Sequence, residues 1–273
     1  MGKMRHASWF LTVRCNFDCP YCWERLYKDL YKGVEFPSPQ ECAAAWNRIP
    51  GELLIDISGG EPFLYRGLFE FFALLDSDKK IAISTNASGD IAKFIQVVPP
   101  ERCVSITLSY HPSNQNNMHD FVGKALCLKN RGYPVVVNFV MYPEQMWLFP
   151  KLEKIFGYFG VPVHADPYGQ NPRNPAFTYN EAELEFLRRY VPDDRRYILE
   201  RRAGRFLCDA GDRHFVVMPD GEAYECLTRR LYGMPSFGNI FDPNFGLATS
   251  RVACEVVACA TCDYDHTSRV AEA

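Results

Sequence analysis

The sequence predicts an α/β protein with a partial, TIM-like (β/α)6 barrel and a smaller C-terminal element. Between Trp9 and Ala165, short apolar runs rich in β-branched residues alternate with amphipathic stretches of helical length. Repeated βα units of this kind form a parallel sheet with helices outside it, and six strands can be counted. Near the C-terminus, Pro219-Asp220-Gly221 separates two further apolar runs and predicts a hairpin beyond the barrel.

The barrel elements follow one another at short spacing. The first helix has a clear start, because Ser38-Pro39-Gln40-Glu41 matches a capping box with proline at the first helical position. We expect strands at Trp9–Val13, Leu53–Ile57, Ile81–Ser84, Val104–Ser109, Val135–Val140 and Val161–Ala165. We expect helices around Ala43–Trp46, Leu68–Leu75, Ile91–Val97 and Asn117–Asn130, and one within Glu144–Tyr158.

Three segments follow the barrel. Tyr168–Pro175 is rich in Gly, Pro and Asn and predicts a crossing loop. A helix is expected over Tyr179–Tyr190, opened by Thr178 or Asn180, and the charged run Asp193–Arg205 is interpreted as a solvated helix face. The predicted division is a barrel over residues 1–175, a helical linker over 176–205 and a C-terminal domain over 206–273.

Composition indicates an intracellular enzyme. The net charge of −3 gives no basic surface for nucleic acid, and neither a transmembrane run nor a signal peptide is present. Eleven cysteines with motif-like spacing suit a reducing compartment and metal clusters better than disulfides. We therefore expect a cytoplasmic protein with no nucleic-acid or membrane partner.

The loop after the first strand carries the first chemical motif. Cys15, Cys19 and Cys22 are spaced C-x3-C-x2-C, with Tyr21 just before the last cysteine and Trp23 after it. Three thiols on so short a loop can ligate three irons of an iron-sulfur cube and leave the fourth without a protein ligand. The alternative is a zinc site, which needs a fourth ligand such as His6 or Cys42.

A second motif follows the second strand. Gly59-Gly60-Glu61-Pro62 comes directly after the apolar run Leu53–Ile57. Two glycines let a backbone approach a ligand closely, and the Glu61 carboxylate can accept hydrogen bonds from an ammonium group.

Together these two motifs resemble those of the radical S-adenosylmethionine (SAM) enzymes. The resemblance implies that the open iron of the 4Fe-4S cluster is chelated by the amino and carboxylate groups of SAM. It further implies that Gly59, Gly60, Glu61 and Pro62 hold the methionine end of SAM, with Tyr21 also at the SAM site. The reduced cluster would cleave SAM to a 5′-deoxyadenosyl radical, with electrons from a flavodoxin- or ferredoxin-type donor.

Polar residues at the carboxyl ends of the later strands are candidates for the active site, since barrel chemistry lies at that end. Ser84 and Asn86 follow the third strand, where the resemblance places the SAM ribose or methionyl group and a plain turn is the alternative. Ser109 and His111 follow the fourth strand and are candidates for SAM contact, with loop stabilisation as the alternative role of His111.

The fifth and sixth strands supply four further candidates. Asn138 interrupts an apolar strand, where its amide needs partners that bound SAM or a structural hydrogen bond would provide. His164, Asp166 and Tyr168 come after the sixth strand and are candidate substrate contacts, with an ordinary surface loop as the alternative.

The C-terminal cysteines form a third pattern. Cys208 precedes the predicted hairpin and Cys226 follows it, and the chain then carries Cys259 and Cys262 in a C-x2-C pair. This resembles the auxiliary-cluster domain of SPASM and twitch radical SAM enzymes, in the shorter twitch form with one cluster. The resemblance implies a second 4Fe-4S cluster on these four thiols, and structural zinc is the alternative.

Cys254 has no assigned partner. It is a core residue, a replacement ligand or a thiol that returns a hydrogen atom to a substrate radical, the role that a cysteine has in aminoglycoside epimerases of this family. Cys42, Cys103 and Cys127 fall in helix or strand patterns and are expected in the core.

The resemblance implies an oxidoreductase or epimerase that removes a hydrogen atom from its substrate. The first candidate substrate is a small polyol, sugar or aminocyclitol, which matches a short chain with one auxiliary cluster. The second is a ribosomally made peptide, although such enzymes often carry a leader-binding domain for which there is no room before Trp9. A hypothesis from another class is a metal-binding module without catalysis.

Overall fold

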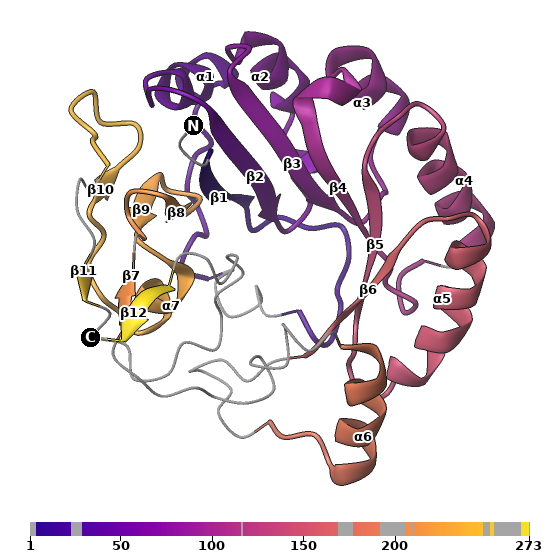
Figure 1. The fold of residues 1–273 in the computed structure, drawn as a ribbon. Coiled ribbons are helices and arrows are strands. Elements are labelled where there is room, and N and C mark those ends of the chain that lie inside the picture. Colours follow the sequence, from indigo (N-terminus) through magenta and orange to yellow (C-terminus); the bar gives the residue numbers. More distant parts are fainter. Residues whose placement is uncertain are drawn as a thin grey trace.

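The computed structural model describes residues 4–22, 29–115, 117–168, 177–191, 206–208, 210–247, 252–253 and 269–272. Strands β1 to β6 form one curved parallel sheet with helices on its outer side (Figure 1). The strands are β1 (Arg5–Thr12), β2 (Leu53–Gly59), β3 (Lys79–Thr85), β4 (Cys103–Ser109), β5 (Val135–Val140) and β6 (Val163–Asp166). The helices are α1 (Pro39–Asn47), α2 (Leu68–Leu74), α3 (Ile91–Val97), α4 (Met118–Lys129), α5 (Phe149–Tyr158) and α6 (Glu181–Tyr190).

These elements confirm the predicted α/β barrel, and local chemistry explains several of their boundaries. The Ser38 side chain accepts a hydrogen bond from the backbone of Glu41, which returns a bond to Ser38, so α1 has the predicted capping box. Asn180 and Glu183 form the same arrangement at the start of α6, which settles the choice between Thr178 and Asn180.

The C-terminal strands change the sheet in a way that the sequence did not predict. The hairpin consists of β8 (His214–Val217) and β9 (Glu222–Tyr224), and Gly221 in its turn has a φ of +84°. Strand β8 pairs in parallel with β1, so the described residues form a nine-stranded sheet in the order β10-β9-β8-β1-β2-β3-β4-β5-β6. The remaining elements are α7 (Leu227–Leu231), β10 (Gly238–Asn239), and a three-stranded sheet of β7 (Phe206–Cys208), β11 (Val252–Ala253) and β12 (Arg269–Glu272).

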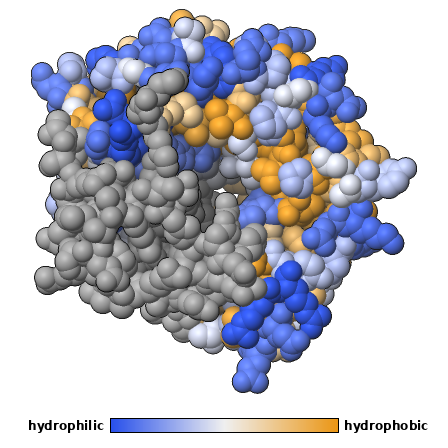
Figure 2. Space-filling view, viewed as in Figure 1, coloured by the Kyte–Doolittle hydropathy of each residue, from blue (hydrophilic) through white to orange (hydrophobic). Residues whose placement is uncertain are grey.

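The hydrophobic core lies between the sheet and its helices. Alternate residues of β5, such as Val137 and Phe139, are fully buried, and the Phe139 ring packs 6.2 Å from that of Phe149 on α5. Figure 2 shows hydrophilic residues along much of the outer rim, with hydrophobic residues inside it. Side chains between these core positions, including Asn138, therefore face the concave side of the sheet.

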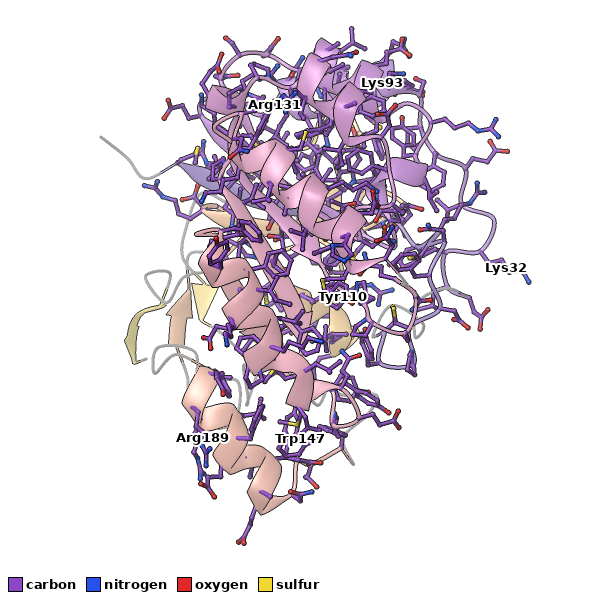
Figure 3. All side chains as sticks on the ribbon, turned by 90° about the vertical axis from the view of Figure 1, so that its right-hand side faces the viewer. Lys32, Lys93, Tyr110, Arg131, Trp147 and Arg189 are labelled. Atoms are coloured by element: carbon purple, nitrogen blue, oxygen red, sulfur yellow. The ribbon has the colours of Figure 1, made fainter. Side chains whose placement is uncertain are left out.

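Helix α6 covers the end of the barrel wall beside α5. The Trp147 ring lies 4.7 Å from the Phe186 ring of α6, and Figure 3 shows Trp147 beside the helix that carries Arg189. Among the described helices, none combines the length and apolar character that crossing a bilayer requires.

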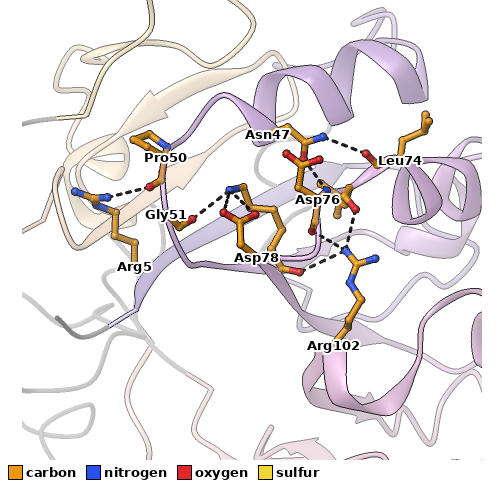
Figure 4. Close-up of polar contacts among 10 residues, drawn as sticks. Arg5, Asn47, Pro50, Gly51, Leu74, Asp76, Asp78 and Arg102 are labelled. Carbon is orange, nitrogen blue, oxygen red and sulfur yellow. Dashed lines mark hydrogen bonds and ion pairs between the residues drawn. The ribbon is translucent and has the colours of Figure 1, made fainter. Parts of the chain in front are cut away.

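The amino ends of the strands are closed by polar contacts to the backbone (Figure 4). The Arg102 guanidinium donates to the carbonyl oxygens of Leu75 and Asp76 at 3.3 and 3.2 Å. The buried Lys79 ammonium donates to the Gly51 carbonyl at 3.1 Å and to the Asp78 carboxylate at 2.9 Å. In barrels of this kind the amino-end face stabilises the fold, which leaves the carboxyl-end loops for chemistry.

Candidate functional site

The three-cysteine loop leaves the carboxyl end of β1, at the barrel mouth. Cys19 is 6% exposed, and the backbone N–H of Cys22 donates to the Cys19 carbonyl at 3.1 Å. The backbone N–H of Phe17 also donates to the Cys15 sulfur at 3.4 Å. The turns of the loop therefore orient one backbone donor toward the Cys15 thiol.

Two side-chain amides from neighbouring loops also reach this loop. Asn86, after β3, places Nδ2 3.9 Å from the Cys15 sulfur. Asn114, after β4, places Nδ2 3.2 Å from the Cys19 sulfur. Because hydrogen bonds of this kind favour the thiolate form, the surroundings of both sulfurs fit metal ligation.

The chemistry of three thiols on one loop fits an iron-sulfur cube, whose fourth iron needs no protein ligand. Within the described residues, no three Cys, His, Asp or Glu side chains are placed to hold one metal ion together. In a cube each thiolate ligates a different iron, so its ligands lie farther apart than those of one zinc ion. The suggested zinc ligands are also elsewhere: His6 lies at the amino end of β1, and Cys42 is buried in α1.

Gly59 and Gly60 approach the cysteine loop itself. The Gly60 N–H donates to the Thr12 carbonyl at 2.6 Å, and the Glu61 N–H donates to the Arg14 carbonyl at 2.8 Å. A Cβ on Gly59 would lie 2.4 Å from the Thr12 oxygen, and one on Gly60 would lie 2.2 Å from the Arg14 oxygen. The glycines are therefore required because their backbone packs against the backbone of the cysteine loop. Sequence reasoning did not identify this neighbour.

Glu61 is fully buried, and its carboxylate joins its own segment after β2 to the end of β3. It accepts hydrogen bonds from the Phe63 N–H at 3.1 Å, the Thr85 hydroxyl at 2.7 Å and the Asn86 N–H at 2.8 Å. Burial raises the pKa of this carboxyl group, against the effect of those bonds. Pro62 then begins a 3-10 helix. The role of this carboxylate toward an ammonium group stays a prediction.

The segment after β3 forms the turn that was the alternative interpretation. Asn86 Oδ1 accepts from the Ser88 N–H at 2.9 Å, while Asp90 is the residue that caps α3. The Asn86 amide also donates to Asn16 on the cysteine loop at 3.0 Å. Ser84 lies on the concave face of the sheet, whereas the residues before and after it in β3 face the helices.

His111 pairs with Tyr21 of the cysteine loop. The Tyr21 hydroxyl lies 2.9 Å from His111 Nδ1, and the rings stack at 5.8 Å. Burial lowers the pKa of His111 to about 4 and raises that of Tyr21, so both are neutral at neutral pH. The Tyr142 ring lies 5.4 Å from Tyr21, and the Tyr168 ring 5.3 Å from Tyr142. These four side chains, Tyr21, His111, Tyr142 and Tyr168, are called the aromatic wall below.

Asn138 joins two of the predicted substrate residues. Its Nδ2 donates to the Asp166 carboxylate at 3.1 Å, and its Oδ1 lies 2.9 Å from His164 Nδ1. Ser109 of β4 is the register partner of Asn138, and Asn138 is in turn the register partner of His164. The concave face therefore carries a row of polar side chains across β4, β5 and β6. This row, called the polar row below, consists of Ser109, Asn138, His164 and Asp166.

The C-terminal cysteines are only partly within the described residues. Cys226 directly precedes α7, and the backbone of Cys208 lies in β7. Cys254, Cys259 and Cys262 lie outside the described residues. Cys42 and Cys103 are buried as expected, whereas Cys127 is partly exposed on α4.

Sequence reasoning missed Asn114, Gln115 and Tyr142. Gln115 donates to the Asn86 carbonyl at 2.6 Å and so links the loops after β3 and β4. The segment His111–Gln115 reads as an ordinary polar turn, and nothing local signals that it contacts a loop 90 residues earlier. Tyr142 follows Val140 by two residues, and only its place after a barrel strand could have singled it out.

Comparison with known proteins identifies a family and a fold. The sequence profile of the radical SAM superfamily matches residues 9–146, half of the 273-residue chain. None of the curated proteins compared with the sequence matches it.

Solved structures share the fold at low sequence identity. SuiB of Streptococcus suis, also solved with the precursor peptide SuiA, has a TM-score of 0.65 and 13% identity over 88% of this chain and 64% of its own. The protein anSMEcpe, with bound AdoMet and Cp18Cys peptide, has a TM-score of 0.57 and 18% identity over 87% of this chain and 78% of its own. BtrN with AdoMet and 2-DOIA covers 88% of this chain and 79% of its own at 15% identity, but its TM-score of 0.42 is too low to support an argument. The present chain thus spans less than two thirds of the length of SuiB.

Proposed function

The chain belongs to the radical SAM superfamily, and from this premise we propose that Cys15, Cys19 and Cys22 ligate a 4Fe-4S cluster that binds SAM. The observation that carries the proposal is the three-thiol loop at the carboxyl end of a parallel sheet, with amide or backbone donors on Cys15 and Cys19. When bound, the reduced cluster supplies the electron that cleaves SAM to methionine and a 5′-deoxyadenosyl radical. The electron comes from a flavodoxin- or ferredoxin-type donor.

The surrounding loops hold SAM against the cysteine loop. Gly59, Gly60, Glu61 and Pro62 receive its methionine end, and the hydrogen bonds from the Gly60 and Glu61 N–H groups to Thr12 and Arg14 hold this segment beside the cysteine loop. Ser84, Asn86, Ser109 and His111 provide polar contacts from the next two strands. The aromatic wall excludes water from one side, and its neutral His111 and Tyr21 add no charge beside the cofactor.

The polar row on β5 and β6 receives the substrate. Asp166 and His164 offer an acceptor and a ring nitrogen, and Asn138 fixes their orientation through its two hydrogen bonds. Tyr168 continues the same side of the mouth. This set suits a substrate that carries hydroxyl or amino groups, such as a polyol, sugar or aminocyclitol, from which a hydrogen atom is abstracted.

A ribosomally made peptide is the second candidate substrate. It is favoured by SuiB and anSMEcpe, which share this fold and were solved with peptides. Backbone amides can occupy the same polar row. Product analysis with each class of substrate separates the two, because only the true substrate acquires or loses hydrogen in step with 5′-deoxyadenosine formation.

The fate of the substrate radical depends on the C-terminal cysteines. A second 4Fe-4S cluster on Cys208, Cys226, Cys259 and Cys262 would accept an electron and give net oxidation. Hydrogen return from Cys254 would give epimerisation instead. In a reaction run in deuterium oxide, the product would then carry deuterium, because the thiol hydrogen exchanges with solvent.

Anaerobic reconstitution followed by reduction with SAM present tests the proposed activity. Formation of 5′-deoxyadenosine supports it. Protein that takes up iron and sulfide but leaves SAM intact would instead be a metal-binding module without catalysis.

A further inference from the structure

The loop after β4 is held rigidly against the cysteine loop. The backbone N–H groups of Asn114 and Gln115 both donate to the His111 carbonyl at 3.0 Å, and the Gln115 side chain accepts from the His111 N–H at 2.6 Å. Tyr110, labelled in Figure 3, anchors the start of this loop through its ring contact with Phe121 at 5.1 Å. The side chain of Asn114 therefore projects from a fixed turn.

The two ends of the Asn114 amide contact consecutive residues of the cysteine loop. Its Oδ1 accepts from the Asp18 N–H at 3.3 Å, while its Nδ2 donates to the Cys19 sulfur at 3.2 Å. The opposite amide orientation would set two N–H groups against each other and an oxygen against the thiolate. The partners therefore fix the orientation, and the donor faces the ligand atom.

The contact of Asn86 with Cys15 has the same chemistry but weaker geometry. Its Nδ2 lies 3.9 Å from the Cys15 sulfur, against 3.2 Å between Asn114 Nδ2 and the Cys19 sulfur. Each amide nitrogen also donates to a nearer oxygen, Asn16 Oδ1 at 3.0 Å for Asn86 and Ser113 Oγ at 2.9 Å for Asn114. Cys19 is also the more buried of the two cysteines, and a hydrogen bond is stronger where water is excluded.

We propose that Asn114 is a positioning residue that holds the Cys19 thiolate and raises the reduction potential of the SAM-binding cluster. This inference rests on the cluster assignment in the proposed function. A donor to a ligating sulfur withdraws electron density from the cluster, which favours the reduced state with its extra negative charge. Asn114 would thereby make the cluster easier to reduce by a biological electron donor.

The test is a redox titration of the SAM-responsive EPR signal in reconstituted protein. Asn114→Leu removes both contacts at similar size, and we expect at least a tenfold loss of the reduced form at fixed potential, or about 59 mV for a one-electron couple. Asn86→Leu, which loses the longer contact, should shift the midpoint less. Asn114→Asp keeps an acceptor for the Asp18 N–H but puts a negative charge beside Cys19, so its potential should also fall.

Iron content and circular dichroism show whether each variant is folded and loaded. If Asn114→Leu does not load, Asn114→Asp decides the question, because it retains the contact that holds the loop. A midpoint equal to that of wild type in either loaded variant would overturn the inference and leave Asn114 as a turn residue. Wild-type protein without a SAM-responsive cluster would instead overturn the proposed function itself.

Discussion

The hydroxyl of Tyr21 lies 2.9 Å from Nδ1 of His111, which joins the cysteine loop after β1 to the loop after β4. The two residues are 90 positions apart in the chain, and their rings also stack. Since burial lowers the pKa of His111 to about 4, this contact joins two uncharged groups at neutral pH.

This pairing predicts a pH dependence of stability. The pKa of His111 falls from 6.5 to about 4 on folding, so between these values the unfolded state binds more protons than the folded state. The contribution of His111 to the free energy of unfolding should be fully present above pH 6.5 and should be lost as the pH falls to 4. That contribution is roughly 3 kcal/mol at most.

Urea unfolding of cluster-free protein at pH 7 and pH 5 measures the effect. His111→Gln should lose less stability between the two values than wild type does. His119→Gln, at an exposed position of α4, is the matched control and should follow wild type. Equal losses of stability in wild type and His111→Gln would contradict the prediction, because they would show that folding does not lower the pKa of His111.

The glycine contacts predict a large difference between two similar substitutions. In Gly60→Ala the new methyl group would meet the Arg14 carbonyl at 2.2 Å, which should cost about 1–3 kcal/mol and displace the cysteine loop. Gly157→Ala on α5 meets nothing within 4 Å and should gain about 0.5–1 kcal/mol from helix propensity. Thermal unfolding of the two variants checks this, and a tolerated Gly60→Ala would mean that the loops are not packed as described.

Asn138→Leu separates the substrate role of the polar row from a role in SAM binding. The leucine is similar in size but leaves the Asp166 and His164 contacts unmade. We expect at least a tenfold loss of substrate turnover, with 5′-deoxyadenosine formation in the absence of substrate retained. If that uncoupled cleavage falls equally, Asn138 contacts SAM, which is one of the two interpretations of its sequence position.

The C-terminal cysteines predict a second cluster that can be removed alone. Wild type should hold about eight irons with matching sulfide after reconstitution, and Cys259→Ala should hold about four. SAM cleavage should persist in the variant, while conversion of substrate to an oxidised product should stop. Zinc in wild type together with about four irons would show instead that the tail is structural.

Local sequence patterns were sufficient for the barrel. Strand β5 and helix α3 occur at the predicted residues, because a β-branched run and an Asp90 cap leave little choice of boundary. The pairing of β8 with β1 was not predictable in this way, since Ser8 and Val216 are register partners far apart in the chain. A parallel partner leaves no turn signal between the two strands.

The candidate site shows the same division. The motif cysteines and glycines were found from spacing alone, but the packing of Gly60 against Arg14 was not. Asn114 carries no signal in the sequence, because an asparagine in a turn is common. Its contact with Cys19 follows only from the curvature of the sheet, which brings the loops after β1 and β4 together.

The formation of 5′-deoxyadenosine by matched cysteine variants tests the central claim most directly. Wild type, Cys15→Ala and Cys127→Ala would be reconstituted anaerobically, reduced and supplied with SAM. Cys127 is a partly exposed thiol on α4, away from the barrel mouth, so its loss should leave SAM cleavage at the wild-type rate. We predict that Cys15→Ala forms no 5′-deoxyadenosine above the protein-free background. Cleavage by Cys15→Ala at a rate close to that of wild type would contradict the assignment of the cysteine loop as the cluster site.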